Sequence, residues 1–137
     1  MGAADRKAGD KAVWYVGKID MGIYSCVAGD ILTDEVVITD EQVGHIARRH
    51  PNDYERFAGY FAQIVQQPDY IIEANKPNTA LILKEIHEEG KSFKTVLRLI
   101  TPGDRPEYKN SIITFMKIDR REWDRLLRNK KILYKRE

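Results

Sequence analysis

The pattern of apolar and polar positions divides the chain into a tail without a period, a mixed segment and a long series of alternating runs. Residues 1–12 (MGAADRKAGDKA) are small and polar, a composition typical of a flexible tail or linker. Residues 13–19 (VWYVGKI) and 22–28 (GIYSCVA) are rich in β-branched and aromatic side chains, and we expect a strand pair that turns near residues 20–22. Residues 34–39 (DEVVIT) are expected to extend this sheet.

A helical period begins at Thr39. Its hydroxyl can cap the first turn, and Gln42 lies three residues later, as a capping box requires. Pro51 ends this helix because the residue before a proline disfavours helical geometry. Asn52, with an acidic residue three positions later, repeats the pattern and predicts a second helix that ends before Pro68. This second helix carries an apolar stripe at helical spacing, made of Phe57, Tyr60, Phe61, Ile64 and Val65.

After residue 68 the period changes from helical to alternating. Four runs bounded by turn residues predict four strands, over residues 69–74, 79–88, 91–100 and 110–118. Glu89 and Gly90 mark a tight hairpin between the second and third of these strands. A longer loop (TPGDRPEYK) precedes the fourth strand. The spacing therefore predicts an antiparallel sheet in the second half of the chain.

The C-terminal segment predicts one more helix and one more strand. Asp119 and Glu122 cap a third helix, whose buried side is expected to carry Trp123, Leu126 and Leu127. Residues 131–135 (KILYK) form a short run rich in lysine, as edge strands commonly are. The whole order predicts an α+β fold, with two consecutive helices packed on one face of a twisted antiparallel sheet and a further helix near the C-terminus.

The length and composition set limits on the class of protein. The chain has 137 residues, which suits one domain with one core, so we expect residues 13–137 to form a single domain. No apolar run approaches the roughly 20 residues that cross a bilayer, and none has the place of a signal peptide. Cys26 is the single cysteine. It leaves no partner for an intrachain disulfide, argues against a cysteine-based zinc site and fits a reducing compartment.

The charge is distributed unevenly along the chain. Residues 1–90 hold 9 basic and 15 acidic side chains, whereas residues 91–137 hold 14 basic and 6 acidic ones, although the net charge is only +2. A basic C-terminal segment on a nearly neutral protein is what an anion-binding face needs. A solvated charged surface is the alternative, and the interleaved acids of residues 119–131 (DRREWDRLLRNKK) favour it.

Two of the three histidines lie in the first predicted helix, beside two arginines. At about 100° per residue, His50 falls on the apolar side with Val43 and Ile46, whereas His45 falls on another side. Each histidine is either a proton-transfer group or an ordinary polar residue. In the second case His50 caps the negative end of the helix dipole and His45 is a solvated surface residue. A spacing of five positions does not place two metal ligands on one face, so we expect no metal here.

Cations also interrupt the predicted strands. Period two puts Lys94 and Arg98 on one face of the third strand. Lys84 breaks an apolar run in the second strand, so its ammonium must reach solvent, pair with an acid or line a wet cleft. A two-residue hairpin turn would pair Glu85 with Lys94 and place Lys84 on the face opposite Arg98. A three-residue turn would place Lys84 beside Arg98, and cross-strand ion pairing is the plain alternative to a ligand site.

The fourth strand carries hydroxyl groups but no known catalytic motif. Ser111 is not part of a G-x-S-x-G elbow, and no Ser-His-Asp order is present. Thr114 alone carries little weight because threonine is common in strands. The sequence contains no glycine-rich phosphate loop, no Walker lysine motif and no H-E-x-x-H motif.

Five segments together resemble one family of nucleases, over about Val36 to Glu137. They are TDEQVGHIARRHP, PDYIIEANKPNTALILKEI, VLRL, YKNSIITFMKI and LLRNKKILYKRE. In their order and spacing they resemble the phage- and toxin-associated domains of the barnase, EndoU, colicin and RelE superfamily. The resemblance implies a small α+β fold and metal-independent cleavage of RNA, without a cofactor. It also implies a toxin that acts in the cytoplasm, delivered between bacteria or carried by mobile elements.

The resemblance further implies site residues and partners. Carried over by position, the active-site segments match His45, His50, Lys84, Arg98, Ser111 and Thr114. No acidic residue clearly takes the place of the general base that some members use. The implied partners are an RNA substrate, such as a transfer RNA, and a cognate immunity protein or antitoxin. Because residues 91–137 carry an excess of basic side chains, we expect the surface of such an inhibitor to be acidic.

Three hypotheses follow for the function. The leading one is a metal-independent endoribonuclease toxin domain, with His45 or His50 as acid or base, Arg98 on the scissile phosphate, Lys84 as a second cation, and Ser111 or Thr114 on phosphate or ribose. A histidine that titrates near neutrality suits the proton transfers, and an arginine fork matches phosphate oxygens. The second is a non-catalytic module that binds RNA or the ribosome with the same basic face. The third is a protein-interaction domain that keeps the fold.

Overall fold

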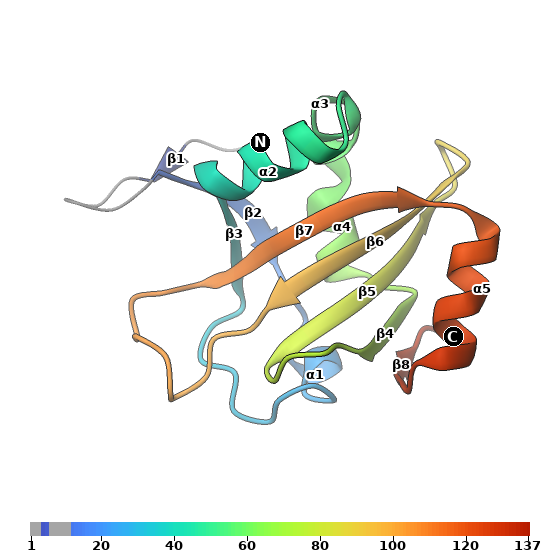
Figure 1. Ribbon diagram of the computed structural model, residues 1–137. Coiled ribbons are helices and arrows are strands. Elements are labelled where there is room, and N and C mark those ends of the chain that lie inside the picture. The colour runs from blue at the N-terminus through green and yellow to red at the C-terminus, as the bar shows by residue number, and fades with distance from the viewer. Residues whose placement is uncertain (1–3, 6–11) are drawn as a thin grey trace.

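The computed structural model describes residues 12–137 and, for Ala4–Asp5, the backbone alone. The described strands form one eight-stranded sheet in the order β1-β2-β3-β7-β6-β5-β4-β8 (Figure 1). Only β3 and β7 are parallel among the described pairs, and the other neighbours are antiparallel. The bounds are β1 Ala4–Asp5, β2 Val13–Lys18, β3 Glu35–Thr39, β4 Tyr70–Glu73, β5 Thr79–Ile86, β6 Lys91–Arg98, β7 Asn110–Ile118 and β8 Ile132–Lys135.

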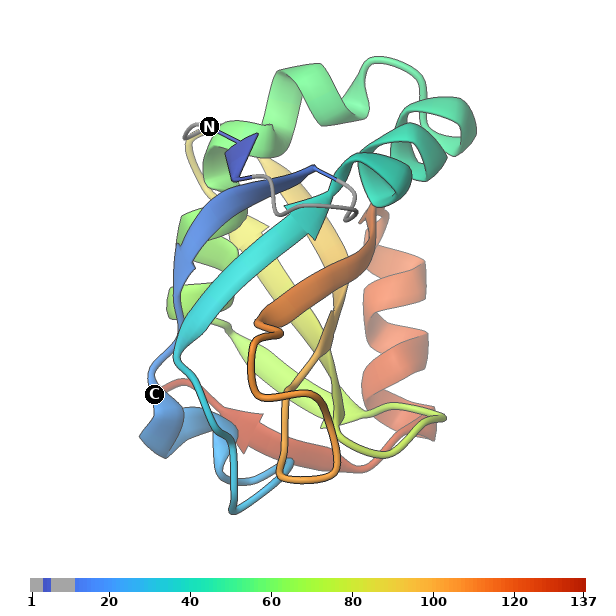
Figure 2. The same ribbon diagram turned by 90° about the vertical axis from the view of Figure 1, so that its left-hand side faces the viewer.

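Helices lie on both sides of the central strands. In the view of Figure 2, the sheet stands between α4 on one side and α5 on the other, and α2 lies above the end of β3. The helix bounds are α1 Met21–Tyr24, α2 Asp40–Arg49, α3 Asp53–Phe57, the 3₁₀ helix η1 Ala58–Tyr60, α4 Phe61–Gln66 and α5 Arg120–Asn129. The mixed α+β class is therefore confirmed. No helix among the described residues is long and apolar enough to cross a membrane.

The strongest sequence patterns gave the right elements. All four alternating runs after residue 68 are strands, and residues 132–135 form the predicted edge strand. The Thr39 hydroxyl accepts a hydrogen bond from the Gln42 backbone N–H at 3.2 Å. Asp119 likewise accepts from the Glu122 backbone N–H at 2.8 Å. Both predicted N-caps are confirmed, and each stabilises its helix by about 1 kcal/mol.

The predicted strand over residues 22–28 is wrong, because this segment begins with helix α1. The Asp20 carboxylate accepts hydrogen bonds from the backbone N–H groups of Gly22 at 2.9 Å and Ile23 at 3.3 Å. An aspartate that bonds the next backbone groups stabilises a helical turn rather than an extended strand. β2 pairs instead with β1 and with β3, and β1 falls within the predicted tail. The rest of that predicted tail lies outside the described residues, apart from Ala12.

The predicted second helix is interrupted. Asn52 has a left-handed backbone (φ 72°) and makes no side-chain cap, so the predicted capping pattern at this residue is wrong. The chain then forms α3, η1 and α4 in place of one continuous helix. Gly59 lies within η1, and glycine is a poor helix former because its backbone loses much freedom in a helix.

The hairpin between β5 and β6 settles the register that the sequence left open. Ile86 pairs with Lys91, so the loop has four residues rather than two or three. Gly90 takes a positive φ of 62° in this loop, which glycine adopts without steric cost. In the resulting register Lys84 lies opposite Phe93, and Leu83 lies opposite Lys94.

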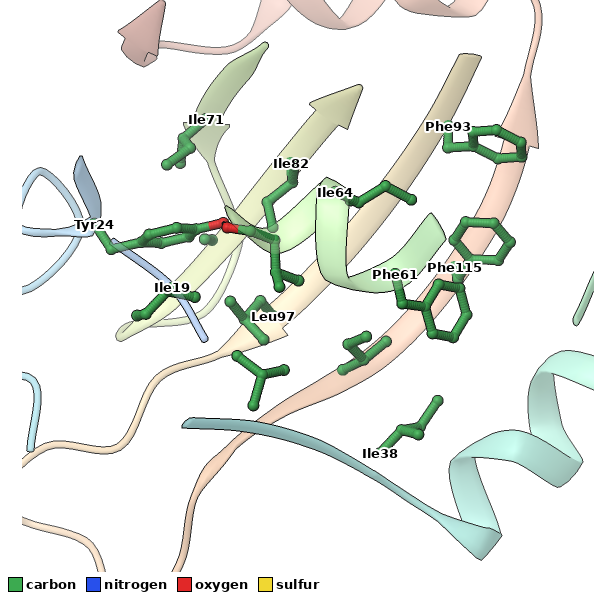
Figure 3. Close-up of a cluster of buried hydrophobic side chains, with 14 of the residues drawn as sticks. Ile19, Tyr24, Ile38, Phe61, Ile64, Ile71, Ile82, Phe93, Leu97 and Phe115 are labelled. Atoms are coloured by element: carbon green, nitrogen blue, oxygen red, sulfur yellow. The ribbon is translucent and has the colours of Figure 1, made fainter. Parts of the chain in front are cut away.

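The main core lies between the sheet and α4, and Figure 3 shows part of it. Phe115 stacks on Phe93 at 4.9 Å between ring centroids and meets Phe61 edge-on at 4.7 Å. Figure 3 also shows the Tyr24 hydroxyl pointing among these side chains, where it donates to the Val65 carbonyl at 2.7 Å. Burial raises the pKa of Tyr24 well above its usual range. This core ties α1, α4 and the central strands together.

A smaller core fills the space under α5. Its buried members are Ile72, Leu83, Ile118, Trp123 and Leu126. The predicted apolar side of this helix is confirmed, since Trp123 and Leu126 are buried and Leu127 packs beside them. α5 packs over this smaller core, and the polar residues described next lie on the same face of the sheet, where they are partly exposed.

Candidate active site

The face of β5, β6 and β7 on the α5 side, called the outer face here, has a part that α5 leaves open. Directly opposed residues of neighbouring strands point to the same face. Arg98 of β6 lies opposite Ser111 of β7, and Val96 lies opposite Thr114, with a β-bulge between the two pairs. Lys94 belongs to the same row by the alternation of β6. We call these five residues the open patch.

All five side chains of the open patch are partly exposed. The sequence predicted that Lys94 and Arg98 share a face, and the register confirms it. Of the residues predicted for the active site, Arg98, Ser111 and Thr114 are therefore brought together on neighbouring strands.

Arg98 is the central cation of the open patch, with about a third of its side chain exposed (34%). One end of its guanidinium donates to the carbonyl of Leu99. The other end donates to the Asp104 carboxylate at 2.9 Å. A guanidinium has five N–H donors, so further donors remain available to an anion that approaches from solvent.

Asp104 is fixed in turn by the loop between β6 and β7. Its second carboxylate oxygen accepts from the Thr101 backbone N–H at 2.9 Å and from the Thr101 hydroxyl at 3.4 Å. The Asn78 side-chain amide donates to that same hydroxyl at 3.4 Å. The hydrogen bond from the Thr101 backbone, together with the charge and hydrogen bond of Arg98, holds the pKa of Asp104 below its ordinary value. Asp104 is therefore ionised at neutral pH.

The base of this loop is closed by Asn110, which is fully buried. Its side-chain oxygen accepts from the Ile100 backbone N–H, and its amide donates to the Thr33 carbonyl, both at 2.8 Å. Beside it, Lys109 forms an ion pair with Glu35 at 2.5 Å, and the hydrogen bond from Lys109 lowers the pKa of Glu35.

Sequence reasoning missed both Asp104 and Asn110. The aspartate after Pro102-Gly103 was the one available indication of a turn built around a carboxylate.

Lys84 does not join the open patch. It lies on the opposite face, with 2% of its side chain exposed, and its ammonium meets the Asp69 carboxylate at 3.3 Å. Asp69 also accepts from the Glu85 backbone N–H at 2.8 Å and from Arg136 at 3.3 Å. The expectation that Lys84 and Arg98 act on one phosphate does not fit this geometry, because the sheet separates the two groups. Lys84 forms an ion pair with Asp69, as in the alternative in which this cation is not part of a ligand site.

His45 lies on the outer side of α2, with 44% of its side chain exposed. Its Nδ1 atom is 3.1 Å from the Arg48 guanidinium, and its Nε2 atom is 3.9 Å from Glu41. These partners belong to the same helix, one turn before and after His45. The recorded contacts of His45 are thus those of a polar residue on a helix surface.

His50 forms the C-terminal end of α2. Its backbone N–H donates to the Ile46 carbonyl at 2.8 Å, so it caps the helix through the main chain. Its Nε2 atom is buried and has no hydrogen-bond partner among the described residues. Ile46, on the same side of the helix, is buried as predicted.

The two histidines lie in α2 and at its C-terminal cap, and α2 contacts β7, the strand that carries Ser111 and Thr114. β3 pairs with β7 through Val37 and Ser111, and two residues later it ends at Thr39, where α2 begins. The helix then packs along β7 (Figure 1). No recorded hydrogen bond or ion pair among the described residues joins His45 or His50 to Arg98, Ser111 or Thr114. The part of the chain that the structure describes also holds no cluster of three or more potential metal ligands among His, Cys, Asp and Glu.

Comparison with known proteins identifies the family. Residues 15–135 match the family model described as phage-Barnase-EndoU-ColicinE5/D-RelE like nuclease2. Neither a curated protein nor a solved structure gave a significant match. The matched region spans most of the chain, from within β2 to the end of β8, and contains every residue of the open patch. The chain therefore belongs to this phage-associated family of nucleases.

Proposed function

We propose that the protein is a metal-independent endoribonuclease that binds the scissile phosphate on the open patch. One observation carries the proposal: a partly exposed arginine, Arg98, lies beside the hydroxyls of Ser111 and Thr114 in a chain from a nuclease family. An arginine fork matches phosphate oxygens, and hydroxyl groups donate to phosphate or ribose. Preorganised donors of this kind often supply the largest share of catalysis.

The reaction that suits these groups uses the substrate's own nucleophile. The RNA 2′-oxygen attacks the adjacent phosphorus and loses its proton, the bond from phosphorus to the 5′-oxygen breaks, and the leaving oxygen gains a proton. The products are a 2′,3′-cyclic phosphate and a 5′-hydroxyl. Arg98 would neutralise the charge that develops on the phosphate oxygens, and Ser111 and Thr114 would fix the phosphate or ribose.

We assign the proton transfers to a histidine of α2, which packs along the strand that carries both hydroxyls. Histidine titrates near neutral pH and contributes about 10²–10⁴-fold as general acid or base. In place of Lys84, Lys94 supplies a second cation on the open patch. It lies four residues before Arg98 on the same strand, about 13 Å away, so it would meet a neighbouring phosphate rather than the scissile one.

The test is cleavage of an RNA oligonucleotide in EDTA, compared with DNA of the same sequence. We expect cleavage of RNA alone, with 2′,3′-cyclic phosphate ends. Arg98→Ala, His45→Ala and His50→Ala, purified in the same way, assign the roles and exclude a contaminating ribonuclease. Undiminished cleavage in all three variants would refute the site. A requirement for Mg²⁺, or equal cleavage of DNA, would refute the mechanism, and salt-dependent RNA binding without scission would indicate a binding module.

The biological role proposed is that of a toxin that acts in the cytoplasm and is neutralised by an acidic inhibitor. The excess of basic residues after residue 90 supports an acidic partner, because opposite charges speed association and fix orientation. Expression inside a bacterial cell should arrest growth, and the Arg98→Ala variant should not. Equal growth of cells that express the wild type and the variant would contradict the toxin role. It would not contradict RNA cleavage measured in solution.

A further inference from the structure

The loop between β6 and β7 holds one ionised carboxylate directly against Arg98. Asp104 uses its two oxygens for two different partners, Arg98 at 2.9 Å and the Thr101 backbone N–H at 2.9 Å. The other terminal nitrogen of the Arg98 guanidinium donates a hydrogen bond to the Leu99 carbonyl. An arginine side chain has several rotatable bonds, so it loses rotamer freedom when it is fixed.

We propose that Asp104 is a positioning residue, which holds the Arg98 guanidinium ready for the scissile phosphate and does not itself contact the substrate. This inference rests on the proposed function of Arg98. Bonds to Leu99 and Asp104 fix both ends of the guanidinium, so it cannot turn away from the open patch when no substrate is bound. The cost of ordering Arg98 is then met during folding and not during each encounter with RNA.

A role as proton acceptor is the main competing interpretation of Asp104. The Thr101 backbone hydrogen bond and the Arg98 guanidinium lower the pKa of Asp104, which makes the carboxylate a weak base at neutral pH. Both of its oxygens already accept hydrogen bonds. The surroundings of Asp104 therefore suit orientation of a cation better than removal of a proton.

The position of the charge gives the proposal a distinctive consequence. A carboxylate beside the phosphate site repels RNA, so its removal should strengthen binding even as catalysis falls. Asp104→Asn is the sharpest variant, because its amide oxygen can still accept from the Thr101 N–H while its NH₂ group faces the guanidinium. This change breaks the bond to Arg98 and preserves the turn. A residue that served the stability of the loop alone would not lower kcat while it left KM constant or lowered it.

The experiment measures kcat, KM and the NMR resonance of the Arg98 Nε–H group in wild type, Asp104→Asn and Asp104→Ala. We expect kcat to fall about 10–100-fold, KM to fall or stay constant, and the Arg98 resonance to broaden or average as the guanidinium gains freedom. Asp20→Asn is the matched control, because Asp20 also accepts backbone N–H bonds in a turn but pairs with no arginine among the described residues. It removes the same charge and should leave kcat unchanged.

The outcomes separate this inference from the proposed function. An active wild type whose Asp104→Asn variant keeps its kcat, or loses kcat/KM only through a higher KM, would overturn the positioning role alone. A wild type without any RNA cleavage would overturn the proposed function and this inference with it. Loss of kcat together with an unchanged Arg98 resonance would also contradict positioning and would point to direct chemistry by Asp104.

Discussion

Lys84 and Arg98 are cations on neighbouring strands, each paired with one carboxylate, yet they belong to different environments. Lys84 is buried on the core side of the sheet. Its partner Asp69 also accepts hydrogen bonds from the Glu85 backbone N–H and from Arg136. Arg98 lies on the open patch with a third of its side chain exposed. A buried ammonium and its acid partner depend on each other, because removal of either one leaves an uncompensated buried charge. A guanidinium at the surface keeps donors for a ligand, so exposure, rather than charge, distinguishes the two roles.

From this comparison, we expect Arg98→Ala to have the largest effect on RNA cleavage. We expect RNA cleavage to fall about 10²–10³-fold, as on loss of a preorganised donor to a developing charge. The free energy of unfolding should change by about 1 kcal/mol or less, because partly exposed ion pairs contribute little. The measurements are kcat/KM on RNA and unfolding in urea. Arg125→Ala is the control, since it removes another exposed arginine–carboxylate pair, to Glu122 at 2.6 Å, on α5 and outside the open patch, although Glu122 also interacts with Lys94.

Equal losses of cleavage in Arg98→Ala and Arg125→Ala would refute a special role of the open patch. A large loss of stability in Arg98→Ala would place this residue with Lys84, as a structural cation.

Lys84→Met should show the reverse pattern. It removes a buried charge partner of Asp69 and should lower the free energy of unfolding by about 2 kcal/mol. This is less than the 3–5 kcal/mol typical of a broken buried pair, because Asp69 keeps two other donors. Cleavage per folded molecule should not change. The matched variant is Lys94→Met, on the neighbouring strand but on the outer face, which should weaken RNA binding and its salt dependence at little cost in stability.

A loss of cleavage in folded Lys84→Met comparable to that of Arg98→Ala would restore Lys84 to the active site. RNA binding by Lys94→Met with an unchanged salt dependence would remove Lys94 from the phosphate path.

The contrast also shows what a sequence can reveal of a site. The alternation of β6 placed Lys94 and Arg98 on one face correctly, because the side-chain period of a strand is fixed. The relation of Lys84 to that face depended on the hairpin, where a loop of four residues set the register. One residue more or less in the loop would shift the pairing and exchange the residues that share a face with Arg98. Glu89-Gly90 alone did not specify the length of the loop.

Helix caps show the same difference between features that depend on neighbouring residues and features that depend on distant ones. Thr39 and Asp119 opened helices as expected, because the acceptor and the bonded N–H are close in sequence. Asp20 was overlooked, although it uses the same bond to begin α1 inside an apolar, strand-like segment. Asp104 could not have been found from spacing alone. Its partner Arg98 lies across a loop whose shape depends on Asn110 and on distant Thr33.

The smallest effects should distinguish the two faces of the sheet through a matched pair of threonines. Thr114 lies on the open patch, whereas Thr95 is fully buried on the core face, where its hydroxyl has no partner among the described residues. Thr114→Val should reduce cleavage up to about 10-fold through one lost hydrogen bond, with stability nearly unchanged. Thr95→Val should leave cleavage unchanged and raise the free energy of unfolding by up to about 1 kcal/mol, because it removes a buried polar group that lacks a partner. Both variants keep the shape of the side chain, so kcat on RNA and urea unfolding compare the two faces directly. If Thr95→Val impaired cleavage as much as Thr114→Val, packing of the strands rather than the hydroxyls of the open patch would limit the reaction.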